Sequence, residues 1–447
     1  MKSSISFVCQ ECGYDSPQWL GKCPECGMWN TLREIQSGVQ SLGKTDGTSA
    51  INITAKKLEE IKIEEKHRIK TCFPELDTVL GGGVVKGSVI LLAGDPGVGK
   101  STLLLQLALN VTSTSSPSFP SVLKVLYISG EESQEQIKLR AKRIYKNIKD
   151  NNLLILSSTS TDQAVLAIVK AKPSLAIVDS IQTMESENVA GLSGSIPQVR
   201  YGASQFIKIA KTLNIPIIIV GHVTKEGMVA GPMVLSHMVD TVLFLEGEKF
   251  TKTRILRSLK NRFGSIDEVG IFTMEEAGIE EIKNPEQLFL SKDGNKNRFG
   301  SVLVVTLEGT RAFLVEIQAL VVASRMPLPR RVASGIDYKR LELLLAVIQK
   351  HCGLPIGGMD VFVNVAGGLK LSDPAADLGI CLAIFSSFKN ICLSDTVVIS
   401  EVGLLGELRG VQSLDKRIKE AKRLGFKKII SCDKYEMLNE AIKSLGK

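Results

Sequence analysis

One stretch of this chain places glycines, a lysine and a hydroxyl at the spacing of a phosphate-binding loop. Residues 94–101 read Gly-Asp-Pro-Gly-Val-Gly-Lys-Ser and fit the pattern G-x-x-x-x-G-K-[ST]. An apolar run before the loop and helix formers after it give the strand–loop–helix order that the motif needs. Lys100 would reach the β- and γ-phosphates and Ser101 would bind Mg²⁺. The sequence therefore predicts a site for ATP and Mg²⁺ built from these residues: Gly94, Asp95, Pro96, Gly97, Val98, Gly99, Lys100, Ser101 and Thr102.

Polar side chains also end three later apolar runs, at positions where strands of the same sheet would finish. One run ends at Asp179, which has the form of a Walker B carboxylate that holds the water shell of Mg²⁺. A second run leads to Glu131 and Glu132, and we take Glu131 as the carboxylate that polarises the attacking water. An acidic pair at a helix start is the alternative for these two residues. A third run leads to His222, which is either a γ-phosphate sensor or an ordinary interface residue.

The first 30 residues contain a different kind of chemistry, two C-x-x-C pairs that are each followed by glycine. Two such knuckles direct four thiolates at one metal, which indicates a structural Zn²⁺ site without an open position for catalysis. An iron centre is one alternative, and a redox dithiol is another that the tandem arrangement outside any βαβ unit argues against. So small a module could barely fold without its metal. The ligands are Cys9, Cys12, Cys23 and Cys26. Trp19 and Trp29 lie in the same module, where we favour core packing over stacking on nucleic acid.

Composition limits the class of protein. The 447 residues have the apolar and charged fractions of ordinary globular domains, 44% and 23%. No uninterrupted apolar run reaches the roughly 18 residues of a membrane span, and the N-terminus lacks the apolar core of a signal peptide. We therefore expect a cytoplasmic protein without a membrane partner. The net charge of +8 is compatible with nucleic acid but does not demonstrate it.

Periodicity predicts an α/β fold class and four regions. Residues 1–30 form the cysteine finger and residues 31–65 a linker. Residues 66–285 alternate strands with helices, which predicts a mostly parallel sheet with helices on both faces, and residues 286–447 form a second α/β region. The strands of the first region are expected at 88–93, 123–128, 153–156, 174–178, 215–220 and 240–245. Helices of the second are expected at 338–350, 374–387 and 414–424.

The order of these motifs is similar to that of the RecA-type ATPase core. Residues 260–264 read Lys-Asn-Arg-Phe-Gly, and with the four-cysteine finger this pentapeptide resembles the RadA (Sms) family of bacterial DNA repair proteins, essentially end to end. The resemblance implies a zinc ribbon, a RecA-like core and a ring-forming, DNA-dependent ATPase, a homo-oligomer taken as a hexamer. It would act on single-stranded or branched DNA in recombinational repair and extend heteroduplex by branch migration, with the recombinase RecA as partner.

Two cations of the pentapeptide, Lys260 and Arg262, follow the last core strands, where a RecA-like domain faces its neighbour. A cation inserted at a neighbour's γ-phosphate stabilises the charge of the transition state. We therefore place both residues with Lys100 and Glu131 in the catalytic set, and a solvated basic turn is the alternative.

Two loops are predicted to contact DNA in a central channel, and flexible surface is the alternative for both. The loops span residues 183–198 and 225–233. Backbone amides and a few cations, Arg200 and Lys225 among them, would bind phosphates without reading sequence.

Residues from about 300 onwards resemble the proteolytic domain of Lon protease but lack its Ser–Lys pair. Ala375 stands where the family has the serine, and Asp415, Lys416 and Arg417 stand near the lysine position. Because a methyl group is no nucleophile, we expect a domain for assembly or for DNA, with a basic helix face as the DNA surface or simply a solvated helix. The cations of that face are Lys416, Arg417, Lys419, Lys422 and Arg423.

Two other functions stay open at this point. One is an ATP-dependent protease of the Lon type, which the missing nucleophile argues against. The other is a strand-exchange recombinase, whose RecA-like core would look the same.

Overall fold

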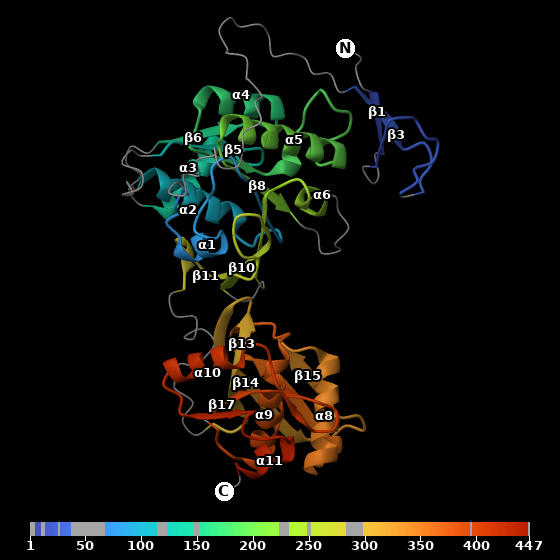
Figure 1. Ribbon diagram of the computed structural model, residues 1–447, viewed down its shortest axis with the longest axis vertical. Coiled ribbons are helices and arrows are strands. Elements are labelled where there is room, and N and C mark those ends of the chain that lie inside the picture. Colours follow the sequence, from blue (N-terminus) through green and yellow to red (C-terminus); the bar gives the residue numbers. More distant parts are fainter. Residues whose placement is uncertain are drawn as a thin grey trace, which may run out of the picture. The chain divides into compact units, whose positions relative to one another are not determined.

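The computed structural model describes residues 5–9, 14–25, 27–36, 68–113, 123–145, 152–222, 232–247, 252–282, 298–393 and 396–445 (Figure 1). The chain forms two compact units. The first holds Met1–Glu246, Ile255–Ile266 and Met274–Glu280, and the second holds Gly247–Arg254, Asp267–Thr273 and Glu281–Lys447. None of the helices described within these ranges combines the length and apolarity needed to cross a bilayer.

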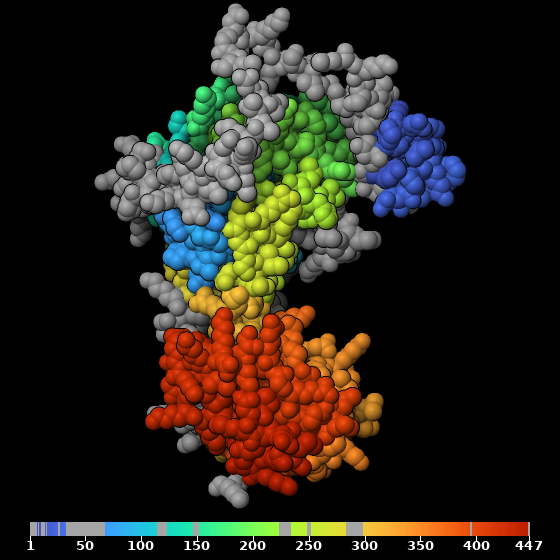
Figure 2. Space-filling view, viewed as in Figure 1, coloured from blue at the N-terminus to red at the C-terminus, as the bar shows by residue number. Residues whose placement is uncertain are grey.

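The cysteine module is a small antiparallel sheet with the strand order β2-β1-β3. Its strands are β1 (Ile5–Cys9), β2 (Asp15–Ser16) and β3 (Leu32–Gln36). Cys9, Cys23 and Leu32 form its buried core, with Phe7, Tyr14 and Leu20 packed against them. Figure 2 shows the described part of the module, in blue, as a compact body.

A nine-stranded sheet, most of whose residues belong to the first unit, has the order β12-β11-β10-β9-β4-β8-β7-β5-β6. Strands β4 to β9 run parallel to their neighbours, and β10 is antiparallel to β9. This arrangement confirms the predicted α/β class and the positions of its strands. The strands are β4 (Val89–Gly94), β5 (Val125–Ser129), β6 (Leu153–Ser157), β7 (Leu175–Asp179), β8 (Ile217–His222), β9 (Thr241–Glu246), β10 (Thr253–Asn261), β11 (Val269–Glu275) and β12 (Gly278–Glu281).

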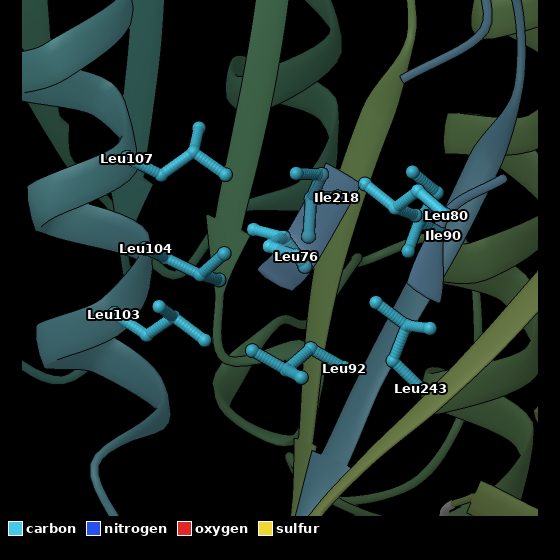
Figure 3. A pocket seen from close by; sticks show the side chains of 9 residues that line it. All are labelled: Leu76, Leu80, Ile90, Leu92, Leu103, Leu104, Leu107, Ile218 and Leu243. Atoms are coloured by element: carbon cyan, nitrogen blue, oxygen red, sulfur yellow. The ribbon is translucent and has the colours of Figure 1, made fainter. Parts of the chain in front are cut away.

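Helices bury both faces of this sheet, which explains why its strands read as continuous apolar runs. Val89 and Leu91 of β4 belong to a core that includes Phe206 of α5 (Ile196–Leu213) and Ile168 of α4 (Thr161–Ala171). Alternate side chains of the same strand point to the other face, where α1 (Pro74–Val79) and α2 (Lys100–Ser113) lie. Figure 3 shows the apolar side chains of that face around a small internal void: Leu76, Leu80, Ile90, Leu92, Leu103, Leu104, Leu107, Ile218 and Leu243.

Local capping signals fix where the shorter helices begin. Ser133 and Gln136 form a capping box at the start of α3 (Gln134–Ile144). The Ser160 hydroxyl accepts a hydrogen bond from the backbone of Gln163 in the first turn of α4. A 3-10 turn, η2 (Ile181–Thr183), follows β7, and α6 (Pro232–Ser236) precedes β9.

The second unit contains a six-stranded mixed sheet in the order β15-β16-β14-β13-β17-β20. Its strands are β13 (Ser301–Glu308), β14 (Arg311–Ala323), β15 (Arg331–Ser334), β16 (Met359–Val365), β17 (Thr396–Ile399) and β20 (Lys428–Ser431). A separate hairpin joins β18 (Glu401–Val402) to β19 (Leu408–Arg409). The helices are α8 (Tyr338–Cys352), α9 (Asp377–Lys389), α10 (Leu414–Arg423) and α11 (Leu438–Lys443), and the first three lie where the sequence predicts them.

Candidate nucleotide-hydrolysing site

The glycines of the loop between β4 and α2 are required by its geometry. Gly94, Gly97 and Gly99 have φ values of +154°, +77° and +112°, which L side chains rarely adopt. A Cβ at Gly94 would collide with the carbonyl of Leu245, and one at Gly99 would collide with the Met274 methyl group. The loop thus passes closer to its neighbours than any side chain would allow. Ser101 and Thr102 lie half-buried in the first turn of α2.

Lys100 is folded back over this loop. Its side chain is nearly inaccessible, at 3% exposure, and its Nζ donates hydrogen bonds to the carbonyl oxygens of Gly94 at 2.8 Å and Asp95 at 2.9 Å. Burial lowers the pKa of Lys100 to about 8, and the nearby charges of Asp179 and Glu131 oppose that shift. The ammonium therefore lacks a direct carboxylate partner among the described residues and is available to an incoming anion.

Asp179 is the last residue of β7, and one of its two carboxylate oxygens has no hydrogen-bond partner in the described structure. Its Oδ2 accepts a hydrogen bond from the hydroxyl of Tyr127, a fully buried residue of β5. Its Oδ1 is buried without a hydrogen-bond partner in the described structure. Burial and the Asp179 charge raise the pKa of Tyr127 well above its usual value, so that the phenol remains a donor. An unsatisfied, buried carboxylate oxygen beside the loop fits a role in holding hydrated Mg²⁺.

The two adjacent glutamates point to different partners. Glu131 accepts a hydrogen bond from the Ser180 hydroxyl at 2.6 Å and lies 3.3 Å from His222 Nε2. The His222 contact lowers the pKa of Glu131 to about 2, and burial acts in the opposite direction. Glu132 forms an ion pair with Arg140 of α3, and burial raises its pKa. Glu131 therefore faces the loop lysine, whereas the charge of Glu132 is matched elsewhere.

Strand register explains why these side chains meet. In the parallel sheet Gly94 lies opposite His222, and Ser129 lies opposite Asp179. The carboxyl ends of β4, β8, β7 and β5 therefore form one edge beside the N-terminus of α2. The sequence analysis did not identify Tyr127 or Ser180. The available signal for Tyr127 was a hydroxyl within an otherwise apolar run beside the Walker B strand.

The cations of the pentapeptide do not lie at this edge. Lys260 Nζ donates hydrogen bonds to the carbonyls of Ser236 at 2.7 Å and Val239 at 2.8 Å. Arg262 has a 62% exposed side chain, whose Nη1 lies 3.7 Å from Asp240 Oδ1. Neither cation contacts the phosphate loop of its own chain.

The contacts of Asp240 show how far Arg262 lies from the phosphate loop. Its Oδ2 accepts hydrogen bonds from the backbone N–H of Val89 at 3.0 Å and from Lys211 at 2.6 Å. Val89 begins β4 and Gly94 ends it, and five steps of about 3.3 Å each separate the two ends by about 16 Å. Arg262 therefore lies at the opposite end of the sheet from Lys100.

Cys9 and Cys23, the two predicted zinc ligands that the structure describes, lie in turns of the kind that binds a metal. The backbone N–H of Cys9 donates to the Tyr14 carbonyl at 2.8 Å, and that of Cys23 donates to the Met28 carbonyl at 2.9 Å, which is the same spacing twice. Gly27 closes the second turn with a φ of +72°. Both thiols are buried in one cluster. The other two predicted ligands, Cys12 and Cys26, lie outside the described residues.

Comparison with known proteins decides the family. Residues 54–228 match the family model of an AAA domain, and residues 7–34 match that of a rubredoxin metal binding domain. The DNA repair protein RadA of Halalkalibacterium halodurans is 45% identical over 97% of this chain and 93% of its own length. RadA of Bacillus subtilis is 47% identical over 96% and 92%, and RadA of Aquifex aeolicus is 46% identical over 96% and 93%.

The chain belongs to the RadA family of DNA repair proteins. The predicted resemblance is thereby confirmed over nearly the whole sequence. Among solved structures, the crystal structure of the RadB recombinase is 23% identical and covers 48% of this chain and 100% of its own. The TM-score of this match is 0.38.

One of the two loops predicted to contact DNA in this RadA-family chain is ordered around a buried glutamine. Gln198 accepts a hydrogen bond from the backbone N–H of Ser186 at 2.9 Å and donates to the carbonyls of Ser186 and Val189. Leu192 projects from the loop with most of its surface exposed. Most of the other loop, including Lys225, lies outside the described residues.

The second unit of this RadA-family chain has a buried ion pair close in the chain to Ala375, the residue that we predicted to stand at the nucleophile position of Lon. Ala375 is fully buried. Arg417 is also buried and donates hydrogen bonds to Asp373 Oδ2 at 2.6 Å and to the carbonyl of Val305 at 2.8 Å. The prediction that Arg417 belongs to an exposed basic face is therefore wrong, because its guanidinium satisfies a partly buried carboxylate. Lys419 and Lys422 of the same helix are exposed.

Proposed function

We propose that this chain is a DNA-dependent ATPase that works as a ring, a hexamer, on single-stranded or branched DNA during recombinational repair. The observation that carries the ATPase is the meeting of Lys100, Asp179 and Glu131 at one edge of the sheet, with a buried oxygen of Asp179 unsatisfied. The relatives are DNA repair proteins named RadA, which supports the DNA substrate. We further propose that the protein extends heteroduplex DNA by branch migration. Its partner would be the recombinase RecA, and it would act in the cytoplasm.

The residues at this edge divide the chemistry. Lys100 would leave the loop carbonyls and bind the β- and γ-phosphates. The negative charge of the phosphates would raise the lowered pKa of Lys100 again, so that the bound lysine stays protonated. Ser101 and Asp179 would hold Mg²⁺, which supplies charge neutralisation when it is bound. Glu131 is ionised at neutral pH, and such a carboxylate orients and polarises a water for in-line attack. Ser180 and His222 hold Glu131 in place.

The transition state still needs a cation, and we assign it to Arg262 of a neighbouring subunit. Arg262 is too far from its own phosphate loop, and its exposed guanidinium is available to a second copy. Lys260, predicted for the same role, is bound to two backbone carbonyls of its own chain. We therefore propose that Lys260 orders the pentapeptide and that Arg262 is the finger.

The remaining regions have supporting tasks in this proposal. Residues 1–30 form a finger that binds Zn²⁺, residues 31–65 a linker, residues 66–285 the ATPase domain, and residues 286–447 a Lon-like domain for assembly or DNA contact. The buried methyl group of Ala375 argues against proteolysis there. Metal analysis of the purified chain should find about one zinc and no iron.

ATP turnover measured with and without single-stranded DNA tests the function. We expect DNA to stimulate turnover, and we expect the ATP-loaded protein to extend a preformed three-strand joint. Efficient pairing of strands that share no joint would indicate a recombinase instead. Release of peptides from casein would indicate a protease. An ATP turnover rate that is the same with and without DNA would contradict the proposal.

A further inference from the structure

The cysteine module exposes both tryptophans of the chain. The exposed fraction is 54% for Trp19 and 69% for Trp29, whereas Cys9, Cys23 and Leu32 supply the core. The core role favoured for the indoles from sequence is therefore wrong. Burying aromatic surface is favourable, so that two large exposed rings on a small module need another explanation.

The two indoles border the same spot on the surface. An ideal Cβ built on Gly21 would lie 3.7 Å from Trp19 Cη2 and 3.9 Å from Trp29 Cζ3. The absence of a side chain at Gly21 therefore leaves the six-membered edges of both rings uncovered. Trp19 is held in orientation because its Nε1 donates to the Leu32 carbonyl at 3.2 Å.

A cation completes this surface. Lys22 pairs with Trp29 in an antiparallel bridge, and its Nζ lies 5.6 Å from the centroid of the Trp29 ring. At this distance the ammonium is attracted to the ring and stays in reach of solvent. The surface consequently combines two flat π-systems with one positive charge, which we call the indole platform (Trp19, Gly21, Lys22 and Trp29).

We propose that the indole platform stacks on unpaired bases of single-stranded nucleic acid, with Lys22 at a phosphate. Aromatic platforms with adjacent cations bind single strands without reading sequence, because every base has a π-face. A duplex hides those faces in its own stack, so the platform selects unpaired nucleotides. A protein partner would match a larger apolar patch. Next to the rings in the chain, Met28 is apolar and exposed, but Gln18 and Asn30 are polar and exposed and Lys22 adds a charge.

This inference rests on the proposed action on DNA and adds a second contact, outside the ATPase core. It is testable with intrinsic fluorescence, because Trp19 and Trp29 are the two tryptophans of the whole chain. The full-length, metal-loaded protein is titrated with oligothymidylate. We expect quenching that saturates with the binding curve, since stacking on a base quenches an indole.

Substitutions separate stacking from folding. Trp29→Ala should weaken oligothymidylate binding about tenfold, because stacking of one base contributes about 1–3 kcal/mol. Trp29→Phe keeps a flat ring and should restore most of that affinity, and Lys22→Ala should cause a smaller loss. Metal content and DNA-free ATP turnover must match the wild type, which shows that the module and core remain folded.

The outcomes distinguish this inference from the proposed function. Oligothymidylate that binds and stimulates turnover, without quenching and with unchanged affinity in Trp29→Ala, would overturn the platform and leave the function intact. In that case the exposed indoles would be assigned to a protein partner. A wild-type chain that does not bind oligothymidylate at all would overturn both proposals.

Discussion

Both ends of the nine-stranded sheet carry lysine and aspartate side chains, but the two ends differ in whether these charged groups have partners. At the carboxyl ends, Lys100 donates only to backbone carbonyls and Asp179 keeps a buried oxygen without a partner in the described structure. At the opposite end, the carboxylate of Asp240 accepts hydrogen bonds from Val89 N–H and Lys211, whereas Arg262 lies 3.7 Å away with most of its side chain exposed. Charges that satisfy one another stabilise the fold, whereas unsatisfied charges indicate room for a ligand.

The comparison also shows what each end lacks. The loop end has the cation and carboxylates for a bound nucleotide, but within the described part of the chain no arginine contacts Lys100 or Glu131. The opposite end has an exposed arginine and no phosphate loop. Two copies of the chain placed head to tail would bring the two halves together, which is why we assign the finger to a neighbour.

The largest effect should come from the carboxylate at the loop end. Glu131→Gln removes the charge that polarises water, and turnover should fall at least about a hundredfold while ATP binding persists. Glu132→Gln is the matched control because its carboxylate pairs with Arg140, and it should leave turnover nearly unchanged. Equal losses in both variants, measured by steady-state ATPase assay, would show that the two glutamates are not distinguished in this way.

A smaller effect should follow when the support of Asp179 is removed. Tyr127→Phe deletes the hydroxyl that donates to Asp179 Oδ2, so that the carboxylate is less well oriented. The Mg²⁺ concentration for half-maximal turnover should rise about tenfold, with turnover at saturating Mg²⁺ close to that of the wild type. A proportional loss of turnover at every Mg²⁺ concentration would point to a packing defect instead.

The weakest of these effects concerns pH. Burial lowers the pKa of Lys100 to about 8, and only its charged form binds phosphate well. The charged fraction falls as pH rises through that value, so ATP affinity should decrease about fourfold between pH 7 and 8.5. In Lys100→Arg the guanidinium stays charged, so a fluorescent ATP analogue should show a flat profile. Parallel profiles in the two proteins would exclude Lys100 as the titrating group.

The parts of the fold with strong local signals were predictable from sequence. The loop residues 94–101, the apolar runs that became strands, and Asp179 at the end of its strand all follow from short-range patterns. The hydrogen bond from Tyr127 to Asp179 depends on which strands are neighbours, and periodicity does not report that order. The partners that separate Glu131 from Glu132 likewise come from β8 and α3.

Burial of single polar or aromatic residues was the least predictable feature. Arg417 belongs to a helix rich in cations, and nothing in that local pattern shows that Asp373 lies beneath it. Trp19 and Trp29 are apolar enough for a core, but the module is filled by Cys9, Cys23 and Leu32. In both cases long-range packing decided the outcome.

The most direct test of the central claim is ATP turnover by mixed rings of Lys100→Ala and Arg262→Ala. Each variant alone should be nearly inactive, and Arg262→Ala should still bind ATP. Lys170→Ala, an exposed cation of α4, serves as the control and should hydrolyse normally. In a mixed ring, the intact loop of an Arg262→Ala subunit can meet the intact arginine of a Lys100→Ala subunit, so we predict that activity returns. Wild-type turnover by Arg262→Ala alone, or verified mixed rings no more active than the single variants, would contradict a site shared between subunits.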